Sequence, residues 1–404
     1  MRSEVISGTA SRWAPGKDRG SQSAHKDPAA PQPKVLLLGA LPPPYIGPTL
    51  ATQVLLSSEL RELFDLIHLD TSDHRPAHTL GRIDLTNIWL AVRSYAALAA
   101  KLARYYPDVV YLPISQTAIG YLKDSIYILV AKLFRRRVVC HLRGGNFRNW
   151  LEGASWPVRC YVRAVHRLVD AQVVLGECLR PLFDGLLPPE RVFVVPNGKD
   201  VTIPPGRRQG GPVRVLFLAN MMRTKGVLEV LYAVPEVVQR FPNVEFVFAG
   251  AWRDADVRDE VTGFLESHPD LPISWLGPVT GEEKYQLLAD SDIFVFPTYY
   301  PPEGHPWVIV EAMAAGLPIV TCDQGAIRES VIDGYNGFLV EKRNPRAVAE
   351  TLIQLASQTH LRHALGASSR RLYQLFFTEA AMAYKLRHVF DYVLIARPRR
   401  PSTA

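Results

Sequence analysis

The sequence of 404 residues contains few cysteines, and none has the spacing of metal ligands or of a disulfide framework. The four are Cys140, Cys160, Cys178 and Cys322, and no two form a CxxC pair. This pattern argues against a zinc site and against structural disulfides. It fits a reducing compartment, so we expect a cytoplasmic protein.

Long hydrophobic runs are also absent. The longest strongly apolar run, residues 126–134, contains Lys132 and is far shorter than the ~20 residues that a membrane-spanning helix needs. The beginning of the chain lacks the apolar core of a secretory signal and is rich in proline, glycine and charge. Residues 1–33 are therefore predicted to be a disordered arm.

The net charge of +7 is concentrated in the first half of the chain. Residues 34–198 hold 19 Lys and Arg against 13 Asp and Glu, whereas residues 199–404 hold 22 against 23. Such a basic surface bears on partners such as anionic lipid, phosphate or nucleic acid. Basic and aromatic residues do not interleave in a nucleic-acid-binding pattern, so no nucleic-acid partner is expected.

Short β-branched or leucine-rich runs alternate with amphipathic segments of helix length, which is typical of parallel sheets built from βα units. The expected strands in the first half are residues 34–38, 63–69, 108–113, 137–142, 172–175 and 192–195. In the second half they are residues 213–218, 244–249, 273–276, 293–297 and 318–321. The pattern predicts two doubly wound α/β domains, and the cleft between them is the expected active site.

A loop rich in proline, glycine and arginine separates the two alternations. The predicted division is a first domain at 34–198, a linker at 199–212, a second domain with C-terminal helices at 213–396, and a basic tail at 397–404.

Glu303 and Glu311 stand at an E-x7-E spacing. The segment between them begins with Gly304, His305, Pro306 and Trp307. Pro306 suits the first turn of a helix, so Glu303 is expected in the preceding loop and Glu311 inside the helix. The helical part rises by only ~7 to 8 Å. One carboxylate can then contact a ribose and the other a transferred sugar, while the N–H groups of the helix start bind a diphosphate.

Five segments, in this order along the chain, are similar to the retaining GT-B glycosyltransferases of family 4, over residues 34 to about 395. They are residues 141–144, which look like the family's HxxG; 195–198, like its interdomain PNG; 218–226, like its diphosphate loop ending in Lys-Gly; 303–311, like its E-x7-E motif; and 325–337, like its GGxPExxxxGxxG stretch. The resemblance implies a GT-B fold, in which two Rossmann-like domains face a cleft, the first binding the acceptor and the second the nucleotide-sugar donor.

By this resemblance, the expected catalytic residues are Glu303, His141, Lys225 and Arg223. Lys225 and Arg223 would stabilise the leaving diphosphate. His141 would hydrogen-bond the donor sugar or stabilise charge at C1. Asn220 stands where the commonest family pattern has an arginine, so Arg223 is expected to matter almost as much as Lys225.

The resemblance also implies a set of donor-binding residues. These are Glu311 for the ribose, Gly277 and Val279 near the base, and Gly304, His305, Pro306, Trp307, Asn220 and Gly47. Gly47 follows the first strand, where related enzymes place a loop over the donor phosphate. Two Asp-x-Asp pairs, at 254–256 and 290–292, sit near a helix start and a strand start and are interpreted as caps. No metal and no cofactor are expected.

The implied activity is that of a metal-independent retaining hexosyltransferase with a UDP- or GDP-linked donor. The acceptor would be a hydroxyl of a glycan or a lipid-linked molecule, in polysaccharide or glycolipid biosynthesis. No third carboxylate stands out as a nucleophile, so the acceptor is expected to attack the face that the leaving group leaves. Two alternatives stay open, a GT-B nucleotide-sugar epimerase and a non-catalytic nucleotide-sugar-binding protein.

A basic cluster of Lys132, Arg135, Arg136 and Arg137 follows an apolar helix of the first domain. Together with the basic first half, it predicts docking on an anionic membrane, peripheral on its inner face, where a lipid-linked acceptor would lie. The alternative is that the helix packs on the sheet and its basic end only caps the helix dipole.

Overall fold

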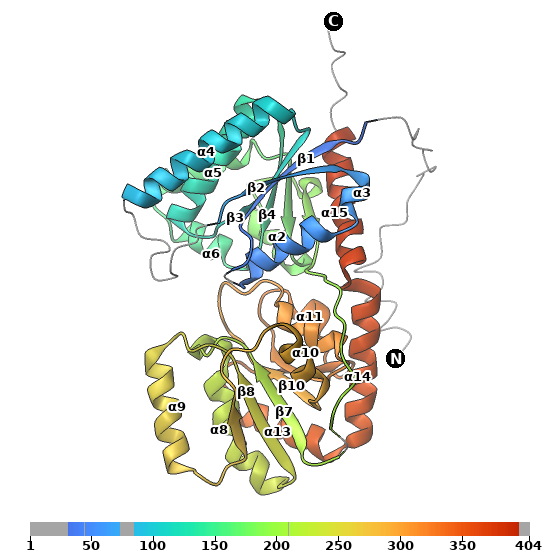
Figure 1. The fold of residues 1–404 in the computed structure, drawn as a ribbon. Helices are drawn as coiled ribbons and strands as arrows, with labels where there is room; N and C mark the ends of the chain where they lie inside the picture. Colours follow the sequence, from blue (N-terminus) through green and yellow to red (C-terminus); the bar gives the residue numbers. More distant parts are fainter. Residues whose placement is uncertain (1–30, 44, 73–84, 209, 396–404) are drawn as a thin grey trace, which may run out of the picture.

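The computed structural model describes residues 31–43, 45–72, 85–208 and 210–395, with the backbone alone for residues 85–88. Most of the predicted arm, residues 1–30, and the predicted tail at 397–404 lie outside the described residues. Two six-stranded sheets, with every strand pair parallel, form two domains one above the other (Figure 1). The predicted fold class of two α/β domains is confirmed.

The first sheet has the strand order β2-β1-β3-β4-β5-β6. Its strands are β1 (Lys34–Gly39), β2 (Asp65–Asp70), β3 (Val109–Ile114), β4 (Arg137–Leu142), β5 (Ala171–Val174) and β6 (Val192–Val194). The helices between them are α2 (Gly47–Ser57), α3 (Leu60–Leu63), α4 (Leu85–Tyr105), α5 (Ala118–Leu133), α6 (Phe147–Glu152) and α7 (Trp156–His166), with 3-10 turns η2 (Glu177–Phe183) and η3 (Pro189–Arg191). None of the helices in the described ranges meets the length and hydrophobicity that a transmembrane segment needs.

The second sheet has the order β12-β11-β10-β7-β8-β9. Its strands are β7 (Val213–Leu218), β8 (Val244–Ala249), β9 (Ile273–Trp275), β10 (Ile293–Phe296), β11 (Ile319–Cys322) and β12 (Gly337–Val340). Its helices are α8 (Val227–Arg240), α9 (Ala255–Ser267), α10 (Gly281–Ala289), α11 (Trp307–Ala314), α12 (Ile327–Ser330), α13 (Pro345–Ser357) and α14 (Thr359–Phe376), with the 3-10 turn η4 (Arg223–Lys225).

Strand β12 is absent from the strands predicted by sequence. It is only four residues long and begins at Gly337, directly after a turn. A Cβ at Gly337 would lie 2.1 Å from the carbonyl oxygen of Ile319 on β11, so only glycine allows this close pairing. The stretch therefore reads as a turn in the sequence although it extends the sheet.

Both faces of the first sheet are buried, as expected for a parallel sheet between two helical layers. On β1, Val35 and Leu37 join one hydrophobic cluster, whereas Leu36 and Leu38 join another on the opposite face. This alternation follows from the two-residue period of a strand.

Helix α15 (Glu379–Ile395), the last helix described, belongs to the core of the first domain. Figure 1 shows α14 beside the second domain and α15, in deeper red, beside the first. Met382, Leu386 and Phe390 are buried there, and the Phe390 ring lies 5.3 Å from that of Phe64 in an edge-to-face contact. The sequence placed α15 in the second domain, because an amphipathic pattern shows that a helix has a buried face but not which core receives it.

Candidate active site

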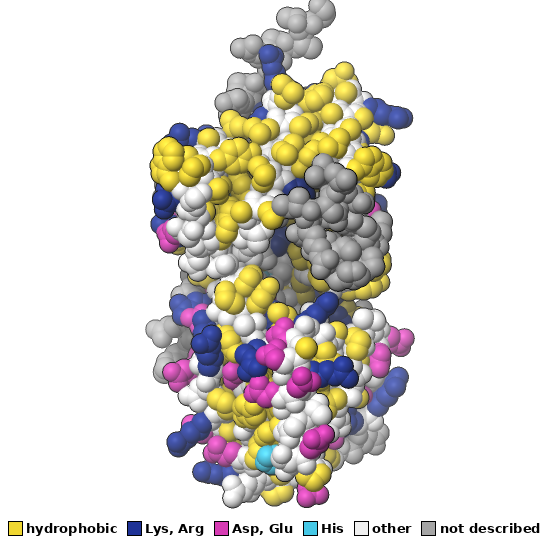
Figure 2. Space-filling view, turned by 90° about the vertical axis from the view of Figure 1, so that its left-hand side faces the viewer, with side chains coloured by type: hydrophobic (Ala, Val, Ile, Leu, Met, Phe, Trp, Pro, Cys, Tyr) yellow, Lys and Arg dark blue, Asp and Glu magenta, His cyan; other side chains and the backbone are white. Residues whose placement is uncertain are grey.

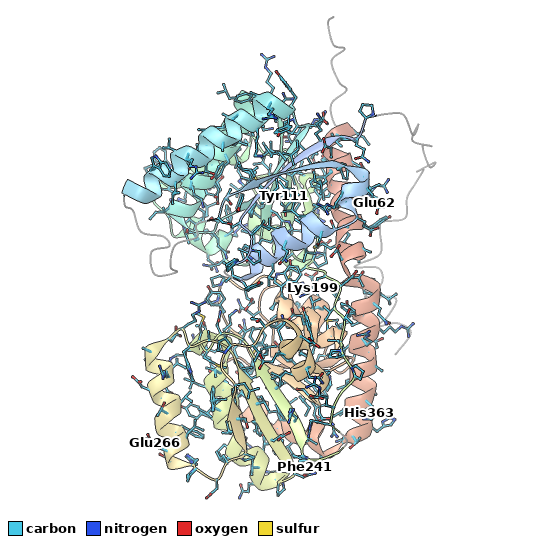
Figure 3. The ribbon with its side chains drawn as sticks, viewed as in Figure 1. Glu62, Tyr111, Lys199, Phe241, Glu266 and His363 are labelled. Atoms are coloured by element: carbon cyan, nitrogen blue, oxygen red, sulfur yellow. The ribbon has the colours of Figure 1, made fainter. Side chains whose placement is uncertain are left out.

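The two domains meet at the loops that follow the carboxyl ends of their parallel strands, where such sheets bind ligands. Gly145, after β4, donates its N–H to the carbonyl of Pro302, after β10, at 3.2 Å. The Asn197 side chain donates to the carbonyl of His305 at 2.6 Å. Figure 3 places Lys199 at this junction of the domains.

A buried carboxylate fixes the two domains against each other. Glu329 in α12 is 6% exposed and accepts the backbone N–H groups of Glu177, at 2.9 Å, and Cys178, at 2.7 Å. These N–H groups begin η2 in the first domain, where a carboxylate is favourable. A Cβ on the neighbouring Gly176 would lie 2.5 Å from that of Ala326, so the chains approach closely.

Glu303 and Lys225, both predicted to be catalytic, form an ion pair. The Nζ–Oε2 distance is 2.5 Å, with the side chains 11% and 15% exposed. Thr298 donates its hydroxyl to the same oxygen of Glu303 at 3.2 Å, and the Lys225 Nζ lies 4.4 Å from the centre of the Tyr300 ring. Gly226, with φ of +85°, provides the left-handed turn between Lys225 and α8. We call Glu303 and Lys225 the Glu303 pair.

Glu311 is 1% exposed inside α11, as its spacing from Glu303 predicted. Its Oε1 accepts from the Nζ of Lys199 at 2.9 Å and of Lys284 at 2.6 Å. Tyr285 also accepts from Lys199 at 2.8 Å. Burial opposes the charge on Lys199, but its contacts with Glu311 and Tyr285 prevail and raise its pKa. We call Glu311, Lys199 and Lys284 the Glu311 triad.

The other oxygen of Glu311, Oε2, is buried and has no hydrogen-bond partner among the described residues. A buried acceptor without a donor costs about 1 to 3 kcal/mol, and more when it is charged. A hydroxyl from a ligand would satisfy it. This is the contact expected of a carboxylate that binds a ribose.

The start of α11 lies between the two glutamates. Helix α11 begins at Trp307. Pro306 was expected in the first turn but is the N-cap residue, in an extended conformation, so the helix begins one residue later than predicted. Trp307 donates its indole N–H to the carbonyl of Gly47 at 3.1 Å, so two predicted donor-binding residues are in contact across the junction. A Cβ on Gly304 would lie 2.6 Å from a methyl carbon of Leu175, so glycine permits this approach.

His305 contributes no charge to this region. It is 3% exposed, neither ring nitrogen has a partner among the described residues, and burial lowers its pKa to about 3. Its ring lies 5.2 Å from that of Phe377. The side chain of this predicted donor-binding residue is therefore neutral and buried beside the hydrophobic cluster of the second domain.

His141 belongs to a hydrogen-bonded network in the first domain. Its Nδ1 lies 2.8 Å from the hydroxyl of Tyr111, which accepts from Arg143 at 2.9 Å. Arg143 also donates to Asn197 at 2.8 Å. Burial, and secondarily Arg143, holds the pKa of His141 well below its usual value. Because the Tyr111 hydroxyl oxygen accepts from Arg143, we assign the Tyr111 O–H as the donor to His141 Nδ1. The one N–H of the neutral imidazole is then at Nε2, which is a donor.

Arg223 is directed to α9. Its Nη2 lies 2.9 Å from Asp256 and 2.7 Å from Glu260, and these hydrogen bonds raise the pKa of Arg223. The side chain is 44% exposed. Arg223 was expected to matter almost as much as Lys225 for the leaving diphosphate, but in the structure Asp256 and Glu260 of α9 hold its guanidinium.

The remaining predicted donor-binding residues lie around the ends of β7 and β9. Asn220 is half-buried between β7 and η4. Gly277 has φ of +68°, and its carbonyl accepts the N–H of Gly250 at 2.7 Å. Val279 is 8% exposed and lines a hollow of about 440 Å³ beside α10.

The Asp-x-Asp pairs were interpreted as caps, but the side chain of Asp254, the N-cap residue of α9, forms no capping hydrogen bond. One aspartate of each pair instead accepts a backbone N–H from another segment. Asp254 accepts the N–H of Arg223 at 3.1 Å, and Asp292 accepts the N–H of Arg214 at 2.9 Å. Within the described ranges, no group of three or more His, Cys, Asp or Glu side chains is arranged to hold a metal ion.

Sequence reasoning missed Lys199 and Lys284 as parts of the site, and it named Arg143 only as a member of the 141–144 motif. Lys199 directly follows Asn197 and Gly198 of the interdomain motif, and this position was the signal that could have identified it. Lys284 had no such signal, because one lysine after two glutamates at a helix start is ordinary surface composition.

Comparison with known proteins found a family model that matches part of the second domain, and curated relatives of about 30% identity. Residues 212–358 match the family model described as Glycosyl transferases group 1. Spore coat protein SA of Bacillus subtilis is 30% identical over 44% of this chain and 48% of its own length. Phosphatidyl-myo-inositol mannosyltransferase of Mycolicibacterium smegmatis is 32% identical over 50% of this chain and 52% of its own length. The chain thus spans about half the length of the curated relatives it matches.

Solved structures match almost the whole chain. The solved structure of Anabaena Alr3699/HepE in complex with UDP and glucose is 17% identical in sequence. The match covers 89% of this chain and 100% of the Alr3699/HepE chain, with a TM-score of 0.64. Sucrose-phosphate synthase from Thermosynechococcus elongatus is 16% identical over 91% of this chain and 100% of that chain, with a TM-score of 0.69. At this identity the likeness shows the fold alone, and the GT-B arrangement expected from sequence is confirmed.

The buried His305 predicts a pH dependence of stability. Between about pH 3 and 6.5 the unfolded chain binds a proton at His305 that the folded chain does not, so stability falls as the pH falls. We expect this residue to cost about 2 kcal/mol of unfolding free energy between pH 7 and pH 5. Urea denaturation at both pH values should show a smaller decrease for His305→Leu than for wild type. His360→Leu, on the exposed surface of α14, is the control, and an equal decrease in all three proteins would contradict the assignment.

Proposed function

We propose that this chain is a retaining glycosyltransferase that moves a hexose-type sugar from a UDP- or GDP-linked donor. The acceptor is a hydroxyl of a glycan or a lipid-linked molecule, in polysaccharide or glycolipid biosynthesis. The observation that carries the proposal is the pairing of two buried carboxylates, Glu303 and Glu311, with lysines on either side of the α11 start.

The proposed donor occupies the second domain along this line. Its ribose hydroxyl donates to Oε2 of Glu311, the buried acceptor without a partner. Its diphosphate contacts Lys225 and the N–H groups at the start of α11, where negative charge is favoured. The base lies towards Gly277 and Val279, and Glu303 contacts the transferred sugar.

In the proposed reaction the acceptor oxygen forms a bond to C1 of the sugar while the bond from C1 to the phosphate oxygen breaks. The new bond forms on the face that the leaving group leaves. The acceptor hydroxyl is then next to that phosphate oxygen and passes its proton to it. Lys225 stabilises the charge that develops on the diphosphate, and the Nε2 donor of His141 is available to a sugar hydroxyl or phosphate oxygen. The protein contributes positioning and electrostatics, and no residue is covalently modified.

Two relatives support the choice of donor and acceptor classes. The solved structure of Alr3699/HepE contains UDP and glucose, which supports a sugar nucleotide as the donor. The mycobacterial relative is a phosphatidyl-myo-inositol mannosyltransferase, which supports a lipid-linked acceptor.

The surface of the first domain supports peripheral docking on an anionic membrane. Apolar side chains of α5 are exposed at positions that lie along one helix face, with Ile119 at 55%, Leu122 at 53%, Leu129 at 40% and Leu133 at 80%. Figure 2 shows hydrophobic side chains gathered on this domain, with Lys and Arg at their margins. An apolar surface with a basic rim binds in the interface of an anionic bilayer.

Only some residues of the predicted basic cluster are available to contact a membrane. Lys132 pairs with Asp170, and Arg136 lies over the ring of Tyr106 at 5.4 Å. Arg135 is exposed. The apolar face of α5 therefore becomes the main proposed contact, and basic residues at its margin add about 1 kcal/mol each.

The two glutamates should differ in their effects. Glu311→Gln should raise the dissociation constant of the nucleoside diphosphate by roughly 10- to 100-fold, because it removes a hydrogen bond to a charged group. Glu303→Gln should leave that constant within about twofold and lower kcat by roughly 100-fold or more, because its contact is to the reacting sugar. Titration calorimetry and product assays with and without acceptor measure both effects. The roles are wrong if Glu303→Gln alone weakens nucleotide binding.

The phosphate loop should depend on one cation. Lys225→Ala should lower kcat by roughly 100- to 1,000-fold, since a donor to developing charge contributes about 3 to 4 kcal/mol. Arg223→Ala should cost less than about tenfold, because its guanidinium is held by α9. The matched alanine variants are compared in one assay, and similar losses would show that Arg223 leaves Asp256 and Glu260 to act on the donor.

Membrane docking is tested by sedimentation with liposomes that contain or lack anionic lipid, at low and high salt. Wild type should bind anionic liposomes best at low salt. Leu133→Gln and the triple change of Arg135, Arg136 and Arg137 to Gln should each weaken binding. Leu375→Gln, an exposed leucine of α14 in the second domain, is the matched control for Leu133→Gln. Equal binding by all four proteins would refute docking by this face.

A further inference from the structure

A second cavity lies at the end of the first domain away from the domain junction. It has a volume of about 280 Å³, and its lining includes Arg137, which begins β4, Asp170, which precedes β5, and Arg191, which precedes β6. These are the amino ends of the strands, whereas the junction lies at their carboxyl ends. The two sites are therefore separated by the length of the sheet, and this inference does not rest on the proposed glycosyl transfer.

The cavity has an excess of positive charge. Four cations line it, Lys132, Arg137, Arg167 and Arg191, together with one carboxylate, Asp170. Lys132 contacts Asp170, so that carboxylate is already engaged, and its Oδ2 also accepts the N–H of Val138 at 2.7 Å. Neither Arg167 nor Arg191 forms an ion pair with another described residue, although both lie at this cavity. Arg167 and Arg191 are thus two cations at one cavity without a carboxylate partner among the described residues, and this arrangement favours an anionic ligand.

The size of the cavity limits the ligand. Its volume of about 280 Å³ is several times the ~30 Å³ that one water occupies in the liquid. It is just below the ~300 to 1,000 Å³ that is usual for pockets that enclose a drug-sized molecule. A small anionic group fits these limits, and a whole nucleotide sugar does not.

We propose that this cavity is a binding site for a phosphate group, held by Arg167 and Arg191. Guanidinium groups bind phosphate oxygens through two parallel hydrogen bonds, which makes arginine the usual residue at such sites. Tyr392, from α15, also lines the cavity. The lining is therefore complete when α15 packs on the first sheet.

The phosphate belongs either to a lipid headgroup or to a soluble phosphate ester. Leu168 lines the cavity and is 41% exposed, and Leu133, next to Lys132 in sequence, is 80% exposed. These apolar side chains near a cationic cavity suit a headgroup at a bilayer surface. The two sources share one chemistry, and separate arms of one experiment distinguish them.

The experiment uses the full chain and two probes. In solution, titration calorimetry compares glycerol 3-phosphate with glycerol. At a surface, sedimentation compares vesicles of phosphatidylglycerol and phosphatidylcholine with vesicles of phosphatidylcholine alone. The cavity variant is R167Q/R191Q. The control is R93Q/R104Q, which removes the same charge from two exposed arginines of α4 that do not line the cavity. Thermal unfolding first verifies that both variants are folded.

If the cavity binds phosphate, R167Q/R191Q should lower the affinity for the phosphate probe at least tenfold. R93Q/R104Q should lower it less than twofold. Binding of glycerol 3-phosphate with this pattern identifies a soluble phosphate ester as sufficient. Binding only to anionic vesicles with the same pattern identifies a lipid headgroup. Similar losses in both variants, unchanged binding in R167Q/R191Q, or no binding of either probe would overturn the proposal.

Discussion

Glu311 imposes a condition on the rest of the site, because a carboxylate that is 1% exposed must be paired to remain charged. Its two lysines come from distant segments. Lys199 follows the last strand of the first domain, and Lys284 belongs to α10 of the second. Loss of one partner from such a buried group typically costs about 3 to 5 kcal/mol. The Glu311 triad therefore ties the interdomain segment, α10 and α11 into one arrangement.

The charges of the site match the proposed ligand. The Glu303 pair is neutral, whereas the Glu311 triad has two lysines for one carboxylate, and Arg143 adds a further cation at the junction. The neighbouring His141 and His305 are kept neutral by burial, which lowers the pKa of both. A diphosphate donor would meet an excess of positive charge at the junction while its hydroxyl groups meet the carboxylates.

The sequence was informative where the physics is local. Two-residue and helical periodicities located most strands, and Pro306 located the α11 start to within one residue. The spacing of Glu303 and Glu311 predicted one residue in the loop and the other in the helix, as found. Backbone geometry fixes local spacing of this kind, so the position of each glutamate can be predicted without knowledge of tertiary contacts.

Other features depend on contacts between residues far apart in sequence. No pattern near Lys284 indicates that it meets Glu311, and none near Arg223 indicates that α9 holds its guanidinium. The return of α15 to the first domain is likewise set by tertiary packing. The cationic cavity follows from the same cause, because its lining comes from four separate segments and Tyr392 of α15.

Binding of a nucleoside diphosphate sugar at the domain junction can be measured on the wild-type chain. Titration calorimetry would compare UDP- and GDP-linked hexoses with the free hexoses and with the corresponding nucleosides. At least one nucleotide sugar should bind with one site per chain, and the free hexose and nucleoside should bind far more weakly, because they lack the diphosphate. Binding of none of the nucleotide sugars, or equal binding of a nucleoside without its diphosphate, would contradict the proposed donor site.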